Sequence, residues 1–279
     1  MAAKRTVLIT GCSDHGLGAA LALAFHKAGW RLKEVVTAGV ETLQVDVTSD
    51  ESIANSVSAV KNLSGGSLDA LVNNAGATYN MPFMDIDIEK TRALFNVNTF
   101  SIITMTRVFL PLLMKSTNGG MVINNTSISS LSVFPFAAVY GTSKAAATGF
   151  TEALRLELSP FGIKVINLMT GSVRSDIWDN GLTPILPPTS LYNIAKETIE
   201  KAIGGGDMAD GANLTTPPHW ILQGRFASQM RMICRFPIGF WGGTVKSLSE
   251  VAVLEQKIKE QRGIEKVVAH NGLEANLSG

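Results

Sequence analysis

The sequence predicts a single α/β domain built around a doubly wound, mostly parallel sheet. Short apolar runs of strand length alternate with longer patterns of helical periodicity, which is typical of parallel strands joined by right-handed crossovers. A glycine-rich turn between Thr10 and Gly18 stands directly after the first apolar run and before the first helical pattern. The 279 residues, 46% of them hydrophobic, are enough for one large domain with a sizeable core.

The elements can be placed in order from these patterns. Strands are expected at residues 7–10, 42–47, 68–72, 121–125 and 164–168. Helices are expected at residues 19–28, 50–61, 87–114 and 139–158, the second of them capped by Ser49 or Asp50. Gly29, Gly65 and Pro160 stand where three of these helices should end.

The carboxyl-terminal part is less regular. We expect a cofactor and catalytic core at residues 5–175, a substrate loop with C-terminal helices at 176–262, and a disordered tail at 263–279. Within the middle part, the proline-rich stretch 182–188 predicts a loop over the substrate, and residues 189–203 and 247–262 predict helices.

Tyr140 and Lys144 are the candidate catalytic pair. Four residues apart on a helix places both side chains on one face. A phenol with a pKa of about 10 is a poor acid or base at neutral pH, but an adjacent ammonium favours the phenolate and lowers that pKa. Such a pair can exchange a proton with a substrate oxygen. Taken alone, the spacing also fits a half-buried tyrosine beside a solvated lysine.

Two further features favour a catalytic role. Ser127 lies thirteen residues before Tyr140, at the polar end of the apolar run that begins at Val122. A hydroxyl at the carboxyl end of a strand can face the crevice where open α/β sheets bind ligands. In the turn from Thr10 to Gly18, glycines allow the backbone to approach a pyrophosphate at a helix amino terminus.

The order of these motifs resembles the classical type of the short-chain dehydrogenase/reductase family, which has a Rossmann-like fold. The resemblance covers roughly residues 6–175 and includes three more motifs: Asp46-Val47, Asn73-Asn74-Ala75-Gly76 and Asn96-Val97-Asn98. Within the family the chain is most similar to the fungal 1-acyldihydroxyacetone-phosphate reductase-like type. That likeness rests on residues 11–16, 134–136 and 170–175.

The resemblance implies hydride transfer between a nicotinamide cofactor, NADP(H) or NAD(H), and a small-molecule ketone or alcohol. Tyr140 would be the acid in reduction and the base in oxidation, and Lys144 would lower its pKa and bind the nicotinamide ribose. Ser127 would hydrogen-bond the carbonyl oxygen, and Asn98 would hold a proton-relay water. The ordinary alternatives are a strand-end hydroxyl for Ser127 and a satisfied polar group within a helix for Asn98.

The family also implies a set of cofactor contacts. Gly11, Gly16 and Gly18 would allow the backbone to approach the cofactor, and Leu17 would offer its amide to the phosphate and pack near the nicotinamide. Asp46 would contact the adenine amino group, and Asn73 would lie by the adenine ribose. Val173 and Ser175 would contact the carboxamide and the phosphate. One departure stands out, because many family members carry Pro-Gly where this chain has Thr170-Gly171. We expect the missing proline to loosen that turn.

A second departure is a missing segment. Only twelve residues separate Gly29 from Thr42, and a parallel crossover alone takes about a dozen. The second strand should therefore be absent or reduced to residues 30–32, leaving a gap in the sheet unless residues 7–10 and 42–47 pair directly. The end of that strand normally reads the adenosine ribose, and here Arg31 and Lys33 are displaced substitutes. We expect weaker cofactor affinity, poor discrimination between NADP and NAD, and reduced stability.

Composition limits the other functions. A net charge of +1 gives no reason to expect nucleic acid binding. Two cysteines, Cys12 and Cys234, form no disulfide framework, and Cys12 with His15 offers too few ligands for a metal. We expect a cytoplasmic protein without a signal peptide or an apolar run of transmembrane length.

Two questions stay open at this level. The apolar run 220–241, with three arginines, fits either peripheral membrane or lipid-droplet contact or a substrate lid or homodimer contact packed on the core. The chain as a whole is either an active reductase of a lipid-like or secondary-metabolite ketone, or an inactive relative with impaired cofactor binding that acts as a binding protein.

Overall fold

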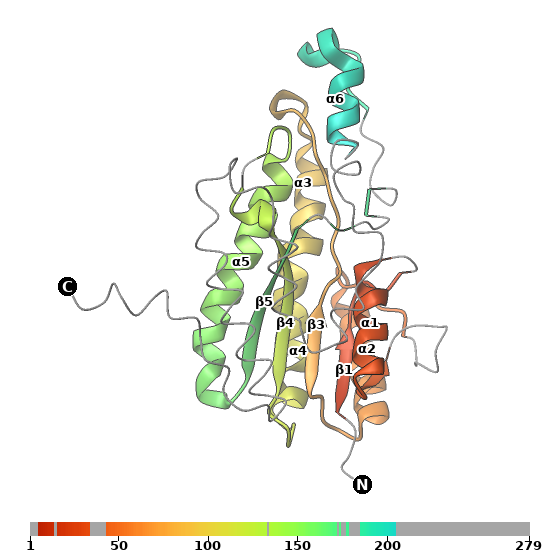
Figure 1. Cartoon of the computed structure of the whole chain (residues 1–279), viewed down its shortest axis with the longest axis vertical. Helices are drawn as coiled ribbons and strands as arrows, with labels where there is room; N and C mark the ends of the chain where they lie inside the picture. The colour runs from red at the N-terminus through yellow and green to blue at the C-terminus, as the bar shows by residue number, and fades with distance from the viewer. Residues whose placement is uncertain are drawn as a thin grey trace, which may run out of the picture. The chain divides into compact units, whose positions relative to one another are not determined.

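A five-stranded parallel sheet forms the centre of the fold (Figure 1). The strand order is β2-β1-β3-β4-β5. The computed structural model describes residues 5–13, 16–33, 43–132, 134–171, 173, 177–178 and 185–204, all within one unit, Met1–Pro218. The strands are β1 Thr6–Ile9, β2 Arg31–Lys33, β3 Ala70–Asn73, β4 Met121–Ser127 and β5 Lys164–Thr170.

Apolar residues set the register of the sheet. Leu8 pairs with Leu71, and Val122 pairs with both Leu71 and Val165. Central parallel strands are buried on both faces, which is why these runs are nearly continuous in Val, Ile and Leu. The parallel α/β fold predicted from the sequence is thereby confirmed.

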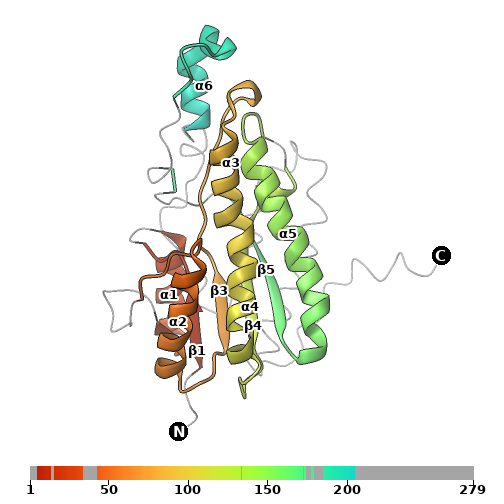
Figure 2. The same cartoon turned by 180° about the vertical axis from the view of Figure 1, so that it is seen from behind.

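The described residues form six α-helices. They are α1 Leu17–Lys27, α2 Asp50–Ser64, α3 Ile88–Phe95, α4 Ser101–Leu113, α5 Ala138–Leu158 and α6 Lys196–Ile203. Figure 2 shows α2, α4 and α5 in front of the sheet, and their apolar side chains pack with those of β1, β3, β4 and β5 in one core. The residues at its centre include Leu8, Ile53, Leu71, Phe109, Val122, Leu154 and Val165.

The helix ends follow the predicted signals. The Ser49 hydroxyl accepts a hydrogen bond from the Ser52 amide, so Ser49 is the cap of α2. Gly65 ends the same helix with a φ of 71°, a left-handed conformation that glycine adopts without steric cost. Both signals could be read correctly because they depend only on neighbouring residues.

The expected helix 87–114 is not one regular helix. The π-helical turn Asn96–Phe100 separates α3 from α4. By length and composition alone, the helical run Ile88–Leu113 could span a membrane, although no segment of transmembrane length was expected from the sequence. Met105, Phe109 and Leu112 of this run are buried in the core under the sheet, which identifies it as a core helix.

The expected strand at residues 42–47 is the clearest correction to the fold. Residues 43–46 have no regular structure, and residues 47–48 form a turn. The alternation that suggested a strand is real, because Leu43, Val45 and Val47 pack against the core while Gln44 and Asp46 are exposed.

The expected second strand is present, one residue further along the chain than residues 30–32, and its shortening stays a prediction because residues 34–42 lie outside the described part of the chain. β2 spans Arg31–Lys33 and pairs with β1, Thr6 opposite Arg31. The predicted gap beside the first strand is wrong, because β1 is paired with β2 on one side and β3 on the other.

The expected helix 189–203 is the 3₁₀ turn Leu191–Ala195 followed by α6. The predictions for residues 205–279 lie outside the described residues.

Candidate active site

Lys144 is a buried cation on the inner face of α5. Its side chain is 4% exposed, and its ammonium donates a hydrogen bond to the carbonyl oxygen of Asn125, 3.1 Å away at the end of β4. Burial lowers the pKa of Lys144 to about 8, because the charged form has lost its water. This lysine can therefore change its charge in the range where enzymes work.

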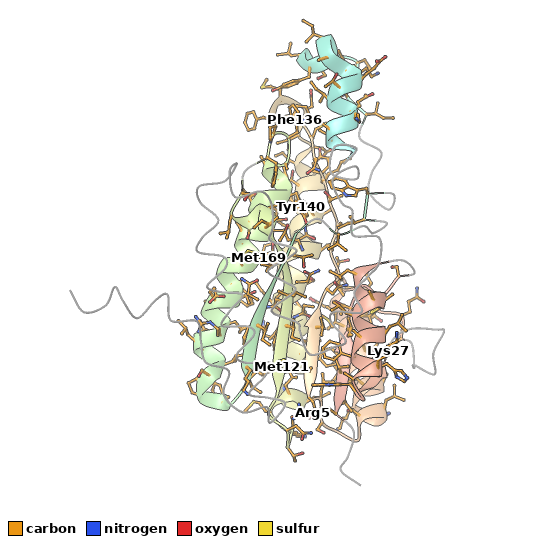
Figure 3. All side chains as sticks on the ribbon, in the orientation of Figure 1. Arg5, Lys27, Met121, Phe136, Tyr140 and Met169 are labelled. Carbon is orange, nitrogen blue, oxygen red and sulfur yellow. The ribbon has the colours of Figure 1, made fainter. Side chains whose placement is uncertain are left out.

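Tyr140 lies one helical turn before Lys144, and Figure 3 shows it with Phe136 at the amino-terminal end of α5. Burial raises the pKa of the Tyr140 phenol, and a hydrogen bond with the Ser127 side chain opposes that rise. The expected lowering of the tyrosine pKa by Lys144 is not found among the described residues. The lysine ammonium is instead directed to the Asn125 carbonyl.

Ser127 brings the end of β4 to the tyrosine. It is the last residue of the strand, and its hydroxyl also accepts a hydrogen bond from the Ser129 amide at 3.1 Å. This bond fixes the side chain at the carboxyl edge of the sheet, where a ligand crevice is expected in such folds. The three predicted catalytic residues of β4 and α5 therefore lie together.

Asn98 joins the π-helical turn to α5. Its amide nitrogen donates to the Ala77 carbonyl and to the Ser143 hydroxyl, both at 3.0 Å, and its oxygen accepts from the Ala77 amide at 2.9 Å. The side chain is 1% exposed and both amide hydrogens are used. A relay water could therefore bind only to the second lone pair of the Asn98 side-chain oxygen or to the Asn98 backbone carbonyl. The role of Asn98 in holding such a water stays a prediction.

The glycine turn is closely packed against the end of β3. Gly11 has a φ of 68°, and a Cβ atom there would lie 2.7 Å from the Ala75 Cα. A Cβ on Gly18 would overlap the Gly11 carbonyl oxygen and lie 2.6 Å from the Asn74 side chain. These two glycines are needed for packing within the protein itself, and the first turn of α1 is thereby brought up to the sheet.

The start of α1 suits a phosphate group. Gly16 is the N-cap residue, and within the described residues no side chain caps this helix. The first amides of a helix lack partners inside the helix, and together with the helix dipole they favour an anion. The residues present, including the Leu17 amide, therefore fit the pyrophosphate of a dinucleotide.

Two other predicted cofactor residues are placed less simply. The Asn73 side chain is buried and donates to Thr106 at 3.2 Å and Asn124 at 2.8 Å, so any ribose contact is left to its backbone. Asp46 is exposed and accepts from the amide and hydroxyl of Thr48, which lowers its pKa. Its adenine contact stays a prediction, as does the role of Val173. Ser175 lies outside the described residues.

Asn74 is the residue of this motif whose role was missed. Its side-chain nitrogen donates to the carbonyl oxygens of Thr10 at 2.9 Å and Gly11 at 3.0 Å, which ties the glycine turn to the end of β3. The Thr10 hydroxyl accepts in return from the amides of Asn74 and Ala75. Only the polar character of the pair Asn73-Asn74 after an apolar strand hinted at such a bond.

An apolar cluster borders Tyr140. Its buried members are Tyr79, Met81, Leu94, Val139, Leu186, Ile199 and Ile203, and Phe136, Tyr140 and Tyr192 pack against it. Phe136 has a φ of 65°, which is unusual for a bulky residue and costs about 1–3 kcal/mol. Its carbonyl accepts from the Met81 amide at 2.8 Å, and its ring meets that of Tyr192 edge to face.

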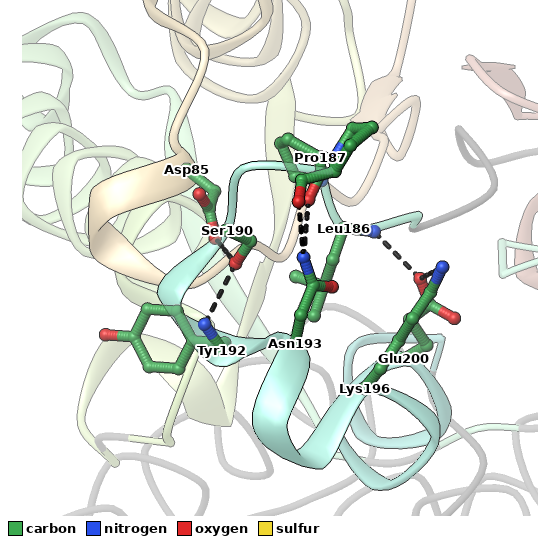
Figure 4. A network of polar contacts seen from close by, with 9 residues as sticks. Asp85, Leu186, Pro187, Ser190, Tyr192, Asn193, Lys196 and Glu200 are labelled. Atoms are coloured by element: carbon green, nitrogen blue, oxygen red, sulfur yellow. Dashed lines mark hydrogen bonds and ion pairs between the residues drawn. The ribbon is translucent and has the colours of Figure 1, made fainter.

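Residues 185–204, called the strap below, complete this cluster (Figure 4). The Ser190 hydroxyl donates to Asp85 at 2.5 Å and accepts from the Tyr192 amide. Within the strap, Asn193 donates to the Pro187 carbonyl and the Leu186 amide donates to Glu200. The strap is therefore held by directed polar contacts as well as by its apolar residues.

In the part of the chain that the structure describes, no group of three His, Cys, Asp or Glu side chains could hold a metal ion. The arrangement instead offers a hydroxyl pair for proton transfer, a buried cation and an anion-binding turn. Such a set is suited to proton exchange at a substrate oxygen beside a phosphate-bearing ligand.

Comparison with known proteins agrees with this geometry. The family model of short chain dehydrogenases matches residues 5–183. A short-chain dehydrogenase/reductase of Pestalotiopsis microspora is 40% identical, with 93% of this chain and 99% of that one covered. The NADPH-dependent 1-acyldihydroxyacetone phosphate reductase of Schizosaccharomyces pombe is 34% identical, with 90% of each chain covered.

Solved structures give the same result. A short-chain dehydrogenase from Streptomyces avermitilis shares the fold, with a TM-score of 0.61 over 88% of this chain and 99% of that one, at 23% identity. An oxidoreductase of Brucella ovis, solved in complex with a partially ordered NAD, is 30% identical. It has a TM-score of 0.55 over 62% of this chain and 85% of that one.

Proposed function

The chain belongs to the short-chain dehydrogenase/reductase family, and from this premise we propose that it is an NADP(H)-dependent reductase of a ketone with an apolar body, of the lipid or secondary-metabolite kind. The family assignment makes it an oxidoreductase that uses NAD(P). The proposal adds the class of substrate and the preferred cofactor.

One observation carries the substrate class. The Tyr140 ring packs against the apolar cluster, and the polar end of the same side chain is hydrogen-bonded to Ser127. A carbonyl oxygen placed at these two hydroxyls would bring the rest of the molecule beside Phe136 and Tyr192, which lie at the edge of the cluster. Apolar and aromatic walls with a few placed polar groups are typical of sites for small apolar ligands.

The NADP(H) preference rests on similarity. The Schizosaccharomyces pombe relative is named as NADPH-dependent, and it is similar over most of its length. Two further relatives are short-chain dehydrogenases from Penicillium ochrochloron and Penicillium crustosum. Poor discrimination between the two cofactors stays a prediction that rests on the twelve residues between Gly29 and Thr42.

The side chains divide the chemistry as follows. The bound nicotinamide supplies or accepts the hydride. Tyr140 gives its proton to the substrate oxygen in reduction, and its raised pKa keeps that proton in place at neutral pH. Ser127 holds the same oxygen through its hydroxyl, and Lys144 places a positive charge one helical turn away. Burial of the lysine strengthens this electrostatic effect because little water screens it.

A matched panel of ketones tests the proposal. Purified protein is assayed with NADPH against long-chain ketones and against polar ketones of similar size, by the loss of reduced nicotinamide absorbance. We expect kcat/KM to rise as the apolar chain lengthens. Faster turnover of the polar ketones than of their apolar counterparts would contradict the substrate class.

The second candidate is an inactive relative that serves as a binding protein. The observation in its favour is the short segment between Gly29 and Thr42, where only twelve residues stand in place of the strand, helix and turn that the family pattern requires. Fluorescence titrations with NADPH and NADH separate the two candidates. Saturable binding together with ketone turnover supports the reductase, and the absence of binding for both cofactors supports the binding protein.

Location and assembly are part of the proposal. We place the protein in the cytoplasm, with either a lipid surface or a second copy of the chain as partner of residues 220–241. Flotation with anionic liposomes and the mass in solution distinguish these partners. Flotation lost on truncation after Pro218 supports the lipid surface, and a dimer lost on the same truncation supports the homodimer.

A further inference from the structure

Three side chains form a hydrogen-bonded ladder across the carboxyl ends of β3, β4 and β5. Asn74 directly follows β3, Asn125 is in β4 and Thr170 is the last residue of β5. The Asn125 amide nitrogen donates to the Asn74 oxygen at 3.0 Å, and the Thr170 hydroxyl donates to the Asn125 oxygen at 2.5 Å. Through Asn74 the ladder continues to the carbonyls of Thr10 and Gly11 in the glycine turn.

The contacts of Asn74 favour one direction of the ladder. The Asn74 nitrogen faces two carbonyl oxygens, so its own oxygen must face Asn125. Asn125 then presents its nitrogen to Asn74 and its oxygen to Thr170. The opposite orientation of Asn125 would set two acceptor oxygens 3.0 Å apart, unless Asn74 also turned and faced its oxygen to both carbonyls.

The same asparagine also holds Lys144. The Asn125 backbone carbonyl accepts the hydrogen bond from the lysine ammonium at 3.1 Å, and the ammonium is buried. Movement of Asn125 would therefore move the partner of a charge that has little water to replace it. One residue thus connects the turn that binds phosphate with the cation beside Tyr140.

Thr170 gives the ladder its far end. Proline, which many family members carry at this position, has no hydroxyl and could not donate to Asn125. The departure that was expected only to loosen the turn therefore also supplies a hydrogen bond. Serine would keep this bond, and valine would remove it at nearly constant volume.

We propose that Asn125, tethered by Asn74 and Thr170, is a positioning residue that couples the glycine turn to Lys144. The inference rests on the proposed function for its catalytic consequence, but the coupling itself is a property of the protein without substrate. While the hydrogen bonds of the ladder are formed, the Lys144 ammonium stays buried at the Asn125 carbonyl. Loss of these hydrogen bonds lets the ammonium leave that carbonyl and weakens the contact between Asn125 and the glycine turn.

Matched variants of the full chain test the coupling without cofactor. Thr170→Val and Asn125→Leu break the ladder, and Thr170→Ser keeps it. Thr126→Val is the control, because the Thr126 hydroxyl donates to Asn167 at 2.6 Å across the same two strands without contacting Lys144. Each protein is treated with a small acylating reagent, and the labelling rate of Lys144 is followed by peptide mass spectrometry together with the melting temperature.

We expect Thr170→Val and Asn125→Leu to label Lys144 about fivefold to tenfold faster, the equivalent of one buried hydrogen bond. Thr170→Ser should label like the wild type, and Thr126→Val should lower the melting temperature without faster labelling. Equal labelling of Lys144 in all five proteins, or faster labelling in Thr126→Val as well, would overturn the proposal. If one ladder variant does not fold, the other decides.

Cofactor measurements extend the test to function. Thr170→Val should weaken NADPH binding by about fivefold to tenfold in a fluorescence titration and lower kcat by a similar factor, with Thr170→Ser restoring both. Unchanged NADPH binding and kcat in Thr170→Val would overturn the coupling. If the wild type reduces no ketone, the proposed function fails while the labelling result still decides the ladder.

Discussion

The Ser127 side chain lies close enough to the Tyr140 phenol to oppose the rise of its pKa, although thirteen residues separate the two in the chain. The first ends β4, and the second lies in the first turn of α5. The polar end of the tyrosine is therefore fixed by the edge of the sheet, and its ring is fixed by the apolar cluster. This relationship makes Tyr140 the side chain best placed to meet a substrate oxygen.

The first prediction concerns Tyr140→Phe. The change removes the proton donor and keeps the ring, so kcat for ketone reduction should fall by about 10²–10⁴-fold. The melting temperature should change little, because the ring still fills its place in the apolar cluster. Steady-state kinetics and thermal unfolding measure the two effects. Turnover that survives the substitution would remove Tyr140 from the mechanism.

The second prediction follows from the lowered pKa of Lys144. Its folded pKa is about 8 and its unfolded pKa is about 10.4, so between these values the unfolded chain binds more protons. Stability therefore rises with pH in this window, by up to about 1 kcal/mol per pH unit from this residue. Lys144→Met, which cannot titrate, should lack this rise.

The measurement compares denaturant unfolding of the wild type and Lys144→Met between about pH 7 and 9.5. Tyr140 is present in both proteins, and its pKa in the folded protein is raised above the ordinary value, so its titration does not create the difference between the two curves. Parallel stability curves for the two proteins would show that Lys144 keeps an ordinary pKa and would contradict the prediction.

The third prediction contrasts two glycines. A Cβ on Gly18 would overlap the Gly11 carbonyl, so Gly18→Ala should cost about 1–3 kcal/mol and weaken cofactor binding. Gly149 lies within α5 with nothing within 4 Å of a Cβ, so Gly149→Ala should stabilise by about 0.5–1 kcal/mol. Denaturant unfolding measures both. Similar effects of the two substitutions would mean that the turn does not pack as described.

The fold could be predicted from helix caps, helix stops and apolar runs, together with the order of the motifs. The cap at Ser49, the stop at Gly65 and the strands β1, β3, β4 and β5 depend on neighbouring residues, and they agree with the structure within a few residues. The prediction of a strand at residues 42–47 was wrong. Apolar and polar residues alternate there because one face of the segment is buried, and such alternation does not require pairing with another strand. Whether a strand forms there depends on a partner strand from another part of the chain, which the local sequence does not identify.

The same distinction applies to the site. The set Ser127, Tyr140 and Lys144 could be found from spacing, because α5 directly presents two of its members. The direction of the lysine ammonium, the inward orientation of Asn73 and the ladder through Asn125 could not be found in this way. Each depends on which atoms of separate strands face each other once the sheet has formed.

The last prediction concerns the strap. The Ser190 hydroxyl accepts a hydrogen bond from the Tyr192 amide and donates one to the carboxylate of Asp85, 105 residues away in the sequence. Ser190→Ala removes this charge-assisted bond and leaves the apolar contacts, so amide exchange across residues 191–203 should speed up by about tenfold. Because the strap completes the apolar cluster beside Tyr140, KM for long-chain ketones should rise while kcat stays nearly constant. Lys196→Ala is the matched control, since its 3.9 Å contact joins an exposed lysine to the partly exposed Glu200 and should contribute little. A fall in kcat with unchanged KM would instead mean that the strap positions the reacting groups and not the apolar body of the substrate.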